Sequence, residues 1–294
     1  MPGVSLTTSS LTKRYGAAEA LRLDDLVLHP GERVGLVGNN GAGKTTFLRL
    51  ALDLIAPTTG HVALDGIRVG GPDLGWKPRV GAFLDAGFLV DFLRPHEYLR
   101  LVGTAYGLSG AEVDARIERY RPFLGNALDG GRLVRDLSLG NAGKVGIVSA
   151  LLPGAGLVVL DEPFANLDPG ARIRLERLLR EEVDGATVLV SSHDLDHVVG
   201  VCTRVLALFR RGHLILDEVD LILHPLKSEL NWPMGGKKVL DLTRNKAGNG
   251  LRWQIPWFLF EAMLGTHFEV GLTVDLQSRA AQGLLKSIRD EIEQ

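Results

Sequence analysis

Short apolar runs recur along the chain from residue 33 to residue 216, and most of them end in polar or glycine-rich residues. The runs at 33–37, 157–160 and 187–190 have the length typical of buried strands. A longer apolar run with helical spacing follows the first strand, over residues 47–54. Buried strands that alternate with helical segments predict an α/β architecture with a parallel sheet.

Between residues 94 and 147 the pattern becomes mostly helical. In the segment 111–120 the charged residues are spaced as on the solvated face of a helix. We therefore expect a helical subdomain, inserted at about 86–155. Near the end of the chain, apolar residues spaced by four predict one helical stripe over 276–294. Packing of that stripe within its own tail is one reading, and contact with a dimer or membrane partner is the other.

Composition limits the classes of function. Lys and Arg number 33 against 35 Asp and Glu, so the net charge of −2 offers no global reason to bind nucleic acid or an anionic membrane. Cys202 is the sole cysteine, which excludes an internal disulfide and fits a reducing compartment and a buried, inert thiol. The longest stretch without charge, 145–160, falls short of the roughly 20 apolar residues of a membrane span. Because residues 1–12 also lack the features of a signal peptide, we expect a cytoplasmic protein.

A glycine-rich loop connects the first strand to its helix. It reads Gly38-Asn39-Asn40-Gly41-Ala42-Gly43-Lys44-Thr45-Thr46 and fits the phosphate-loop pattern Gly-x-x-x-x-Gly-Lys-Ser/Thr. Glycines allow several backbone N–H groups to converge on one phosphate at the N-terminus of a helix. Lys44 can then reach the terminal phosphates, and the Thr45 hydroxyl can join the coordination of Mg²⁺. The alternative is a glycine turn with a surface lysine, which the complete pattern in a strand–helix context disfavours.

The second strand, 157–160, runs into Asp161-Glu162-Pro163. A carboxylate at the carboxyl end of a parallel strand is placed to hold Mg²⁺, so Asp161 is a candidate metal ligand. Glu162 follows directly and can polarise an attacking water as a general base. An acidic pair after a strand is common, but together with the upstream loop it predicts a nucleotide triphosphatase.

Together these residues resemble the ATP-binding cassette family over about 1–217. The resemblance implies a P-loop NTPase with a RecA-like core, an N-terminal antiparallel β-subdomain and an inserted helical subdomain. It also implies Mg²⁺-dependent hydrolysis of ATP. Tyr15, in the segment 11–16, matches the aromatic residue that the family stacks on adenine. Without that context Tyr15 would be read as a packed strand residue.

The segment Leu137-Ser138-Leu139-Gly140-Asn141 occupies the place of the family signature, Leu-Ser-Gly-Gly-Gln. Ser138 and Gly140 are retained, and the resemblance implies that they contact ATP bound by the opposite subunit of a homodimer or heterodimer. Such a variant resembles short bacterial exporter subunits, although an impaired signature is the alternative. Residues 165–168 resemble the dimer-contact loop of the family.

His193 resembles the family's switch histidine, which contacts the terminal phosphate and helps orient the attacking water. A zinc pair with His197 is the competing reading, and it lacks a third ligand of suitable spacing. Asp85 stands where the family usually has glutamine, and it is an oxygen ligand of shorter reach for Mg²⁺ or water. The apolar segment 87–93 corresponds to the place where the family receives a short helix of its membrane partner. The core of the helical subdomain is an equal alternative for that segment.

Residues 218–294 depart from the cassette pattern. Of 36 glycines, 29 precede residue 218, and three of the four tryptophans follow it, which supports a boundary near residue 217. The tail faintly resembles a segment of large eukaryotic proteins of unknown function that carry a helicase-like region. It has no phosphate loop of its own, and we expect an α/irregular extension of unknown role.

Our leading hypothesis is the ATPase subunit of an exporter that acts with a separate transmembrane permease at the cytoplasmic face of the membrane. A regulatory module that uses nucleotide as a switch with little hydrolysis is the alternative, because Asp85 and the signature depart from the family. A third option is an ATPase of the same fold that acts on DNA or the ribosome. An ATPase of that kind would need a concentrated basic stripe, and the sequence shows none, so no nucleic-acid partner is expected.

Overall fold

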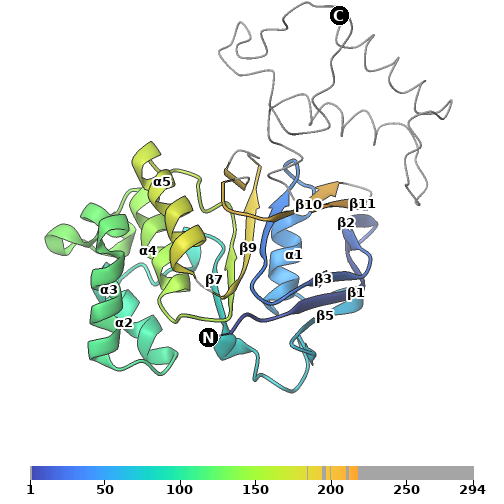
Figure 1. Ribbon diagram of the computed structural model, residues 1–294, viewed down its shortest axis with the longest axis horizontal. Coiled ribbons are helices and arrows are strands. Elements are labelled where there is room, and N and C mark those ends of the chain that lie inside the picture. The colour runs from blue at the N-terminus through green and yellow to red at the C-terminus, as the bar shows by residue number, and fades with distance from the viewer. Residues whose placement is uncertain (1, 184, 194–196, 199, 210–211, 218–294) are drawn as a thin grey trace, which may run out of the picture. The chain divides into compact units, whose positions relative to one another are not determined.

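The computed structural model describes residues 2–183, 185–193, 197–198, 200–209 and 212–217. All of them belong to one compact unit, Met1–His224. Within this unit the helices α2–α5 gather on one side of a central sheet, and a second sheet lies on the other (Figure 1). The predicted extension 218–294, with its helical stripe, lies outside the described residues.

The central sheet has six strands in the order β11-β10-β4-β9-β8-β7. They are β4 (Arg33–Val37), β7 (Val80–Phe83), β8 (Leu157–Leu160), β9 (Thr187–Ser192), β10 (Arg204–Phe209) and β11 (Gly212–Asp217). Neighbouring strands are parallel except for the pair β10–β11. The strands predicted at 33–37 and 157–160 are confirmed with the same bounds, and the third extends two residues further, to Ser192. All four residues of β8 are buried, as expected for a strand covered on both faces.

The second sheet is antiparallel and has five strands. They are β1 (Leu6–Tyr15), β2 (Ala18–Leu23), β3 (Leu26–Leu28), β5 (Thr59–Leu64) and β6 (Ile67–Arg68). This is the N-terminal β-subdomain that the family resemblance implies. It shares one hydrophobic core with α1 (Lys44–Ala51), whose Phe47 and Leu48 are completely buried. The helix begins three residues before the predicted apolar run, because Gly43, at φ 102°, turns the chain directly into it.

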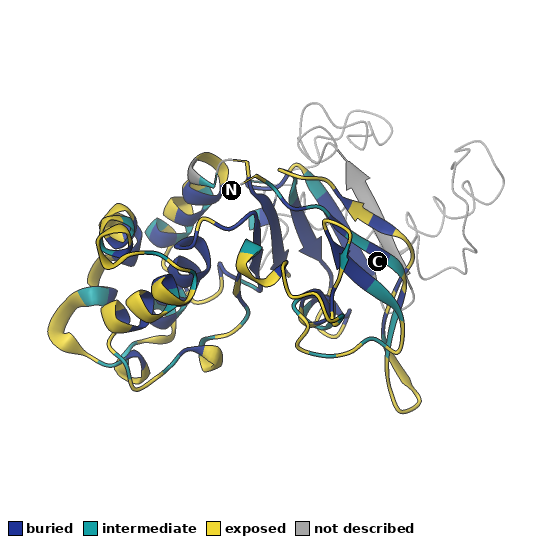
Figure 2. Ribbon diagram, turned by 90° about the horizontal axis from the view of Figure 1, so that it is seen from below, coloured by how far each residue is buried: buried dark blue, intermediate teal, exposed yellow. Residues whose placement is uncertain are grey.

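The inserted helical region contains α2 (Pro95–Ala105), α3 (Gly110–Leu124) and α4 (Leu139–Leu151), with short turns η2–η4 at 86–88, 125–131 and 134–136, while the short turn η1 at 77–79 precedes β7. Helix α5 (Pro169–Arg177) and the π-turn η5 (Leu178–Glu182) follow β8. Helix α2 approaches α3 closely, since a Cβ on Gly103 would lie 2.4 Å from a methyl carbon of Val113. The inward sides of these helices and the central strands are buried, while the outward sides of the helices are exposed (Figure 2). These helices confirm the helical pattern over 94–147.

Candidate nucleotide-binding site

The carboxyl ends of β4, β8 and β9 meet at one edge of the central sheet. Val37 is the register partner of Ser192, and Leu160 is the partner of Val190. The glycine loop 38–43, the acidic pair 161–162 and the end of β9 therefore project from the same edge. In open α/β sheets this edge is where ligands bind. The sequence predicted these segments separately, and strand order and register bring them together.

The loop 38–43 has the geometry of a phosphate cradle. Gly38, Gly41 and Gly43 have φ values of 153°, 82° and 102°, which side chains rarely tolerate. A Cβ on Gly38 would lie 2.5 Å from the Leu208 carbonyl oxygen, and one on Gly43 would lie 2.7 Å from the Ala20 carbonyl oxygen. The cavity beside this loop has a volume of about 340 Å³, and its lining comprises Ala20, Asn39, Asn40, Gly41, Gly43, Lys44, Thr45, Thr46 and Glu162. The residues present therefore fit a bound phosphate group.

Ala42 and Gly38 are also predicted to contact the nucleotide, and in the structure they make hydrogen bonds within the loop and to Lys44. Ala42 is buried, and its N–H donates to the Asn39 carbonyl oxygen at 3.0 Å. The Gly38 carbonyl oxygen accepts from the Lys44 ammonium, at 2.5 Å. Neither residue belongs to the cavity lining.

Lys44 is a buried cation at the first position of α1. Only 7% of its surface is exposed, and its Nζ lies 3.6 Å from Oε1 of Glu162. An ammonium withdrawn from water is costly unless anions or hydrogen-bond acceptors surround it. The loop thus holds a positive charge where it can meet a terminal phosphate.

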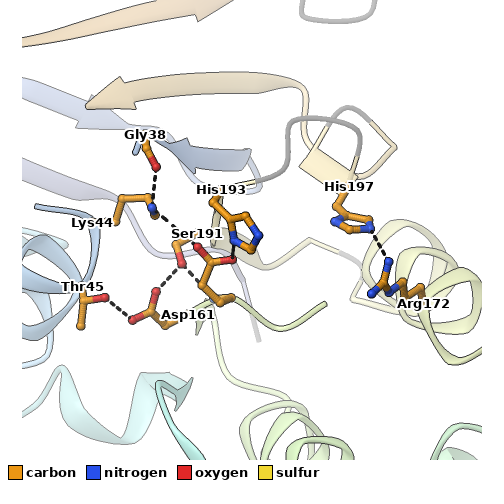
Figure 3. Close-up of polar contacts among 9 residues, drawn as sticks. Gly38, Lys44, Thr45, Asp161, Arg172, Ser191, His193 and His197 are labelled. Carbon is orange, nitrogen blue, oxygen red and sulfur yellow. Dashed lines mark hydrogen bonds and ion pairs between the residues drawn. The ribbon is translucent and has the colours of Figure 1, made fainter. Parts of the chain in front are cut away.

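Thr45 and Asp161 form the oxygen pair that Mg²⁺ would use. The Thr45 hydroxyl donates to Oδ2 of Asp161 at 2.7 Å, and Asp161 is buried (Figure 3). Mg²⁺ prefers one or two protein oxygens together with phosphate oxygens and water. This donor set beside a phosphate cradle fits a magnesium–nucleotide complex.

Glu162 lies between a cation and an imidazole. Its Oε1 faces Lys44, and its Oε2 lies 2.8 Å from Nδ1 of His193. The backbone of Glu162 has φ 46°, an uncommon conformation for a residue with a side chain. Strained backbones of this kind concentrate at functional sites. The ring of His193 is exposed to solvent beside this carboxylate.

Ser191 is part of this constellation, although sequence reasoning did not single it out. Its hydroxyl donates to Oδ1 of Asp161 and accepts from the Glu162 N–H at 2.9 Å. The available signal in the sequence was a polar residue near the carboxyl end of an otherwise apolar strand.

Asp85 and Tyr15 lie outside the lining of the phosphate-loop cavity. The Asp85 side chain accepts from the Gly87 N–H at 2.5 Å, so it caps the short turn η2, and it lines a second cavity. Its coordination of Mg²⁺ stays a prediction. Tyr15 ends β1 with 54% of its surface exposed, and the Lys13 ammonium lies 5.0 Å from the centre of its ring. Stacking of this ring on adenine also stays a prediction.

The signature segment packs against the loop 165–168 of its own chain. Ser138 caps α4, its hydroxyl accepting from the Asn141 N–H at 3.3 Å, and a Cβ on Gly140 would lie 2.4 Å from the Asn166 carbonyl oxygen. Asp168 caps α5 and lies 3.3 Å from the Lys144 ammonium. The hydrogen bond from the helix backbone, with a further contribution from the lysine, holds the pKa of the Asp168 carboxyl below its usual value.

The two histidines weighed as a zinc pair have different partners. His193 faces Glu162, whereas Nε2 of His197 lies 3.5 Å from Arg172 Nη1 (Figure 3). The His197 ring also stacks on Phe164, with 4.9 Å between ring centroids.

A glycine cradle at a helix N-terminus, with a buried lysine and a Thr–Asp oxygen pair at the carboxyl edge of a parallel sheet, defines a P-loop nucleotide triphosphatase. Within that class, residues 21–165 match the family model described as ABC transporter. The chain is 34% identical to the ABC transporter ATP-binding protein NatA of Bacillus subtilis, over 81% of this chain and 100% of that protein. The chain therefore belongs to the ATP-binding proteins of the ABC transporter family.

Other comparisons agree. An ABC transporter ATP-binding protein of Nostoc sp. is 34% identical over 66% of this chain, and the Nod factor export ATP-binding protein I of Cupriavidus pinatubonensis is 33% identical over 67%. The matched region spans 59% and 61%, respectively, of the length of those relatives. A solved ATP-binding subunit of an ABC transporter superposes with a TM-score of 0.66 at 28% identity, over 74% of this chain and 91% of that one. No helix among the described residues has the length and apolar character needed to cross a membrane.

Proposed function

We propose that this chain hydrolyses ATP and thereby drives export through a separate transmembrane permease. The observation that carries the proposal is the convergence of Lys44, Thr45, Asp161, Glu162 and His193 at one edge of the sheet. Membership of a family of transporter ATPases supports the coupling to transport. Similarity to a protein named for Nod factor export, together with the exporter-like signature, supports the direction.

Each residue has a role that its surroundings support. Lys44 and the loop N–H groups stabilise negative charge on the terminal phosphate, in a site prepared before the nucleotide arrives. Glu162 accepts the proton of the attacking water, and His193 holds the Glu162 carboxylate and would contact the terminal phosphate of a bound nucleotide. Thr45 and Asp161 would hold Mg²⁺, which supplies further neutralisation of the phosphate charge when bound. We place the adenine on Tyr15.

A second ATP-binding cassette completes the site in this proposal. Ser138 and Gly140 lie at the start of α4, outside the lining of their own chain's phosphate-loop cavity. A helix N-terminus that carries a serine hydroxyl favours an anion, which fits the nucleotide of an opposite subunit. The partner is a second copy of this chain or a related cassette.

The second cavity, of about 310 Å³, is our proposed contact with the permease. Phe88 in its lining is 60% exposed, and Phe92 of the same segment is 66% exposed, whereas Leu89, also in the lining, is buried in the helical core. The burial of Leu89 agrees with a role of this segment in the helical core, and docking of a partner helix on its exposed side stays a proposal. An apolar groove with exposed aromatic residues fits a short helix of a membrane protein. Such docking would hold the chain at the cytoplasmic face of the membrane.

One observation favours a second candidate, a nucleotide-dependent regulatory module with little hydrolysis. The side chain of Asp85 is engaged by its own turn, where the family usually has a longer glutamine. Measuring Mg²⁺-dependent phosphate release by the full chain, with and without a co-purifying membrane protein, separates the two candidates. The ATPase proposal expects turnover that Lys44→Ala abolishes. Tight ATP binding without turnover in either condition would favour the module.

A further inference from the structure

The hydroxyl of Ser191 connects the two acidic residues of the nucleotide site. Ser191 is completely buried, one residue before the end of β9. Its Oγ donates to Oδ1 of Asp161 and accepts from the backbone N–H of Glu162 at 2.9 Å. A serine hydroxyl has one donor and two acceptor positions, so both bonds form at the same time.

The first bond fixes the orientation of the Asp161 carboxylate. Oδ1 is held by Ser191 from β9, and Oδ2 is held by Thr45 from α1 (Figure 3). A carboxylate held on both oxygens has a fixed plane, so its remaining lone pairs point in fixed directions. Because Mg²⁺ demands near-octahedral geometry, that orientation decides how well Asp161 serves as a ligand.

The second bond supports an uncommon backbone. With φ at 46°, the chain at Glu162 turns in the left-handed region, which disfavours residues that carry a Cβ. The same dihedral angle sets the direction of the glutamate side chain toward Lys44 and His193. By satisfying the Glu162 N–H in this conformation, Ser191 stabilises the turn that aims the proposed base.

We infer that Ser191 is a positioning residue for nucleotide hydrolysis, acting through Asp161 and the main chain of Glu162. The inference rests on the proposed ATPase function. Groups that orient a metal ligand typically change metal affinity or activity about 10–100-fold when they are removed. Ser191 has the position of such a group, because it contacts the proposed metal ligand on one side and the proposed base on the other.

Thr187 provides a matched control at the opposite end of the same strand. It is also completely buried, and its hydroxyl donates to the Val4 carbonyl oxygen at 2.7 Å and accepts from the Gly31 N–H at 3.0 Å. Thr187→Val therefore removes an equivalent pair of buried hydrogen bonds away from the site. Any general cost to the fold should appear in both variants.

The test compares Ser191→Ala with Thr187→Val and the parent chain. Thermal unfolding reports the fold, electron paramagnetic resonance titration with Mn²⁺ in the presence of a non-hydrolysable ATP analogue reports metal binding, and steady-state kinetics separate kcat from KM. We expect Ser191→Ala to lower Mn²⁺ affinity and kcat about 10–100-fold with little change in KM, while Thr187→Val retains both. Equal Mn²⁺ affinity in all three proteins, or equal losses in both variants, overturns the inference.

A second variant and the metal titration allow a decision even if Ser191→Ala does not fold or the parent chain shows no turnover. If Ser191→Ala does not fold, Ser191→Cys preserves the packing with a weaker donor and acceptor, and the same loss of Mn²⁺ affinity is expected. If the parent chain shows no turnover, the ATPase proposal fails, yet the Mn²⁺ titration still decides the role of Ser191.

Discussion

Nδ1 of His193 lies 2.8 Å from Oε2 of Glu162, and the other oxygen of the same carboxylate lies 3.6 Å from the Lys44 ammonium. In the tautomer that carries its proton on Nδ1, the histidine donates to the glutamate. The carboxylate is therefore held from two sides at the mouth of the phosphate-loop cavity. A group held in this way is well placed to take a proton from water without losing its orientation.

Replacing this base should separate binding from chemistry. Glu162→Gln keeps the size of the side chain but cannot accept the proton, so we expect turnover to fall about 10²–10⁴-fold with ATP affinity retained. Phosphate release and equilibrium nucleotide binding measure the two effects. Glu118→Gln, an exposed acid on α3, is the control and should match the parent. Normal turnover in Glu162→Gln would rule out Glu162 as the essential base.

The signature glycine should not tolerate even one methyl group. A Cβ on Gly140 would lie 2.4 Å from the Asn166 carbonyl oxygen, so Gly140→Ala should separate α4 from the loop 165–168 and reduce turnover. Gly143→Ala is the matched control on the same helix, because no atom lies within 4 Å of its added Cβ. Alanine there should stabilise the fold by about 0.5–1 kcal/mol.

Thermal unfolding and phosphate release compare these two glycine variants. A Gly140→Ala variant that keeps the turnover of Gly143→Ala would contradict this close packing.

A substitution at Asp85 can distinguish whether its carboxylate only caps η2 or also coordinates Mg²⁺. Because the side chain accepts from the Gly87 N–H, Asp85→Asn keeps the acceptor that caps η2 and removes only the charge. We expect the Mg²⁺ concentration for half-maximal turnover to remain that of the parent. A clear rise in that concentration would instead show that the carboxylate takes part in metal coordination, as its sequence position predicts.

The exposed ring of Tyr15 should contribute to the affinity for the base of the nucleotide. Stacking on one base is worth about 1–3 kcal/mol, so Tyr15→Ala should weaken ATP binding by that amount while Tyr15→Trp retains it. Calorimetry with ATP and with inorganic tripolyphosphate separates base from phosphate contacts. Equal losses for both ligands would indicate a change in the loop rather than stacking.

Cys202 should behave as an internal reporter of unfolding. Burial raises the pKa of its thiol from 9.0 to about 12, so the folded chain holds it protonated at pH 9, where an unfolded chain forms substantial thiolate. We expect an alkylating reagent at pH 9 to modify the native protein very slowly and the urea-unfolded protein fully. Because Cys202 is the sole cysteine, one label per chain is the measurement, with Cys202→Ser as the blank. Rapid labelling of the native chain would contradict its burial.

The local sequence was sufficient to predict those parts of the site in which the chemistry requires fixed residue types at fixed spacing. The turn from β4 into α1 requires Gly43 in a left-handed conformation, followed by Lys44 and Thr45. The motif can therefore be recognised from the sequence without knowledge of the fold. The strand at 33–37 followed from its short length, its mostly apolar residues and the glycine-rich loop after it, which together favour a buried strand over a helix. The apolar run 47–54 differs from α1 at both ends: the first turn of the helix is polar, so apolar periodicity does not detect it, and the helix ends at Ala51.

By itself, the sequence determined the class of the protein, its phosphate loop and its acidic pair, since each is encoded by neighbouring residues. The tertiary structure alone decided that Ser191 holds Asp161 and Glu162, and that Asp85 turns to its own loop. Apolar periodicity specifies which positions are buried, but not which buried polar groups meet. That outcome depends on the strand order β4-β9-β8 and its register, which place residues distant along the chain within hydrogen-bond reach.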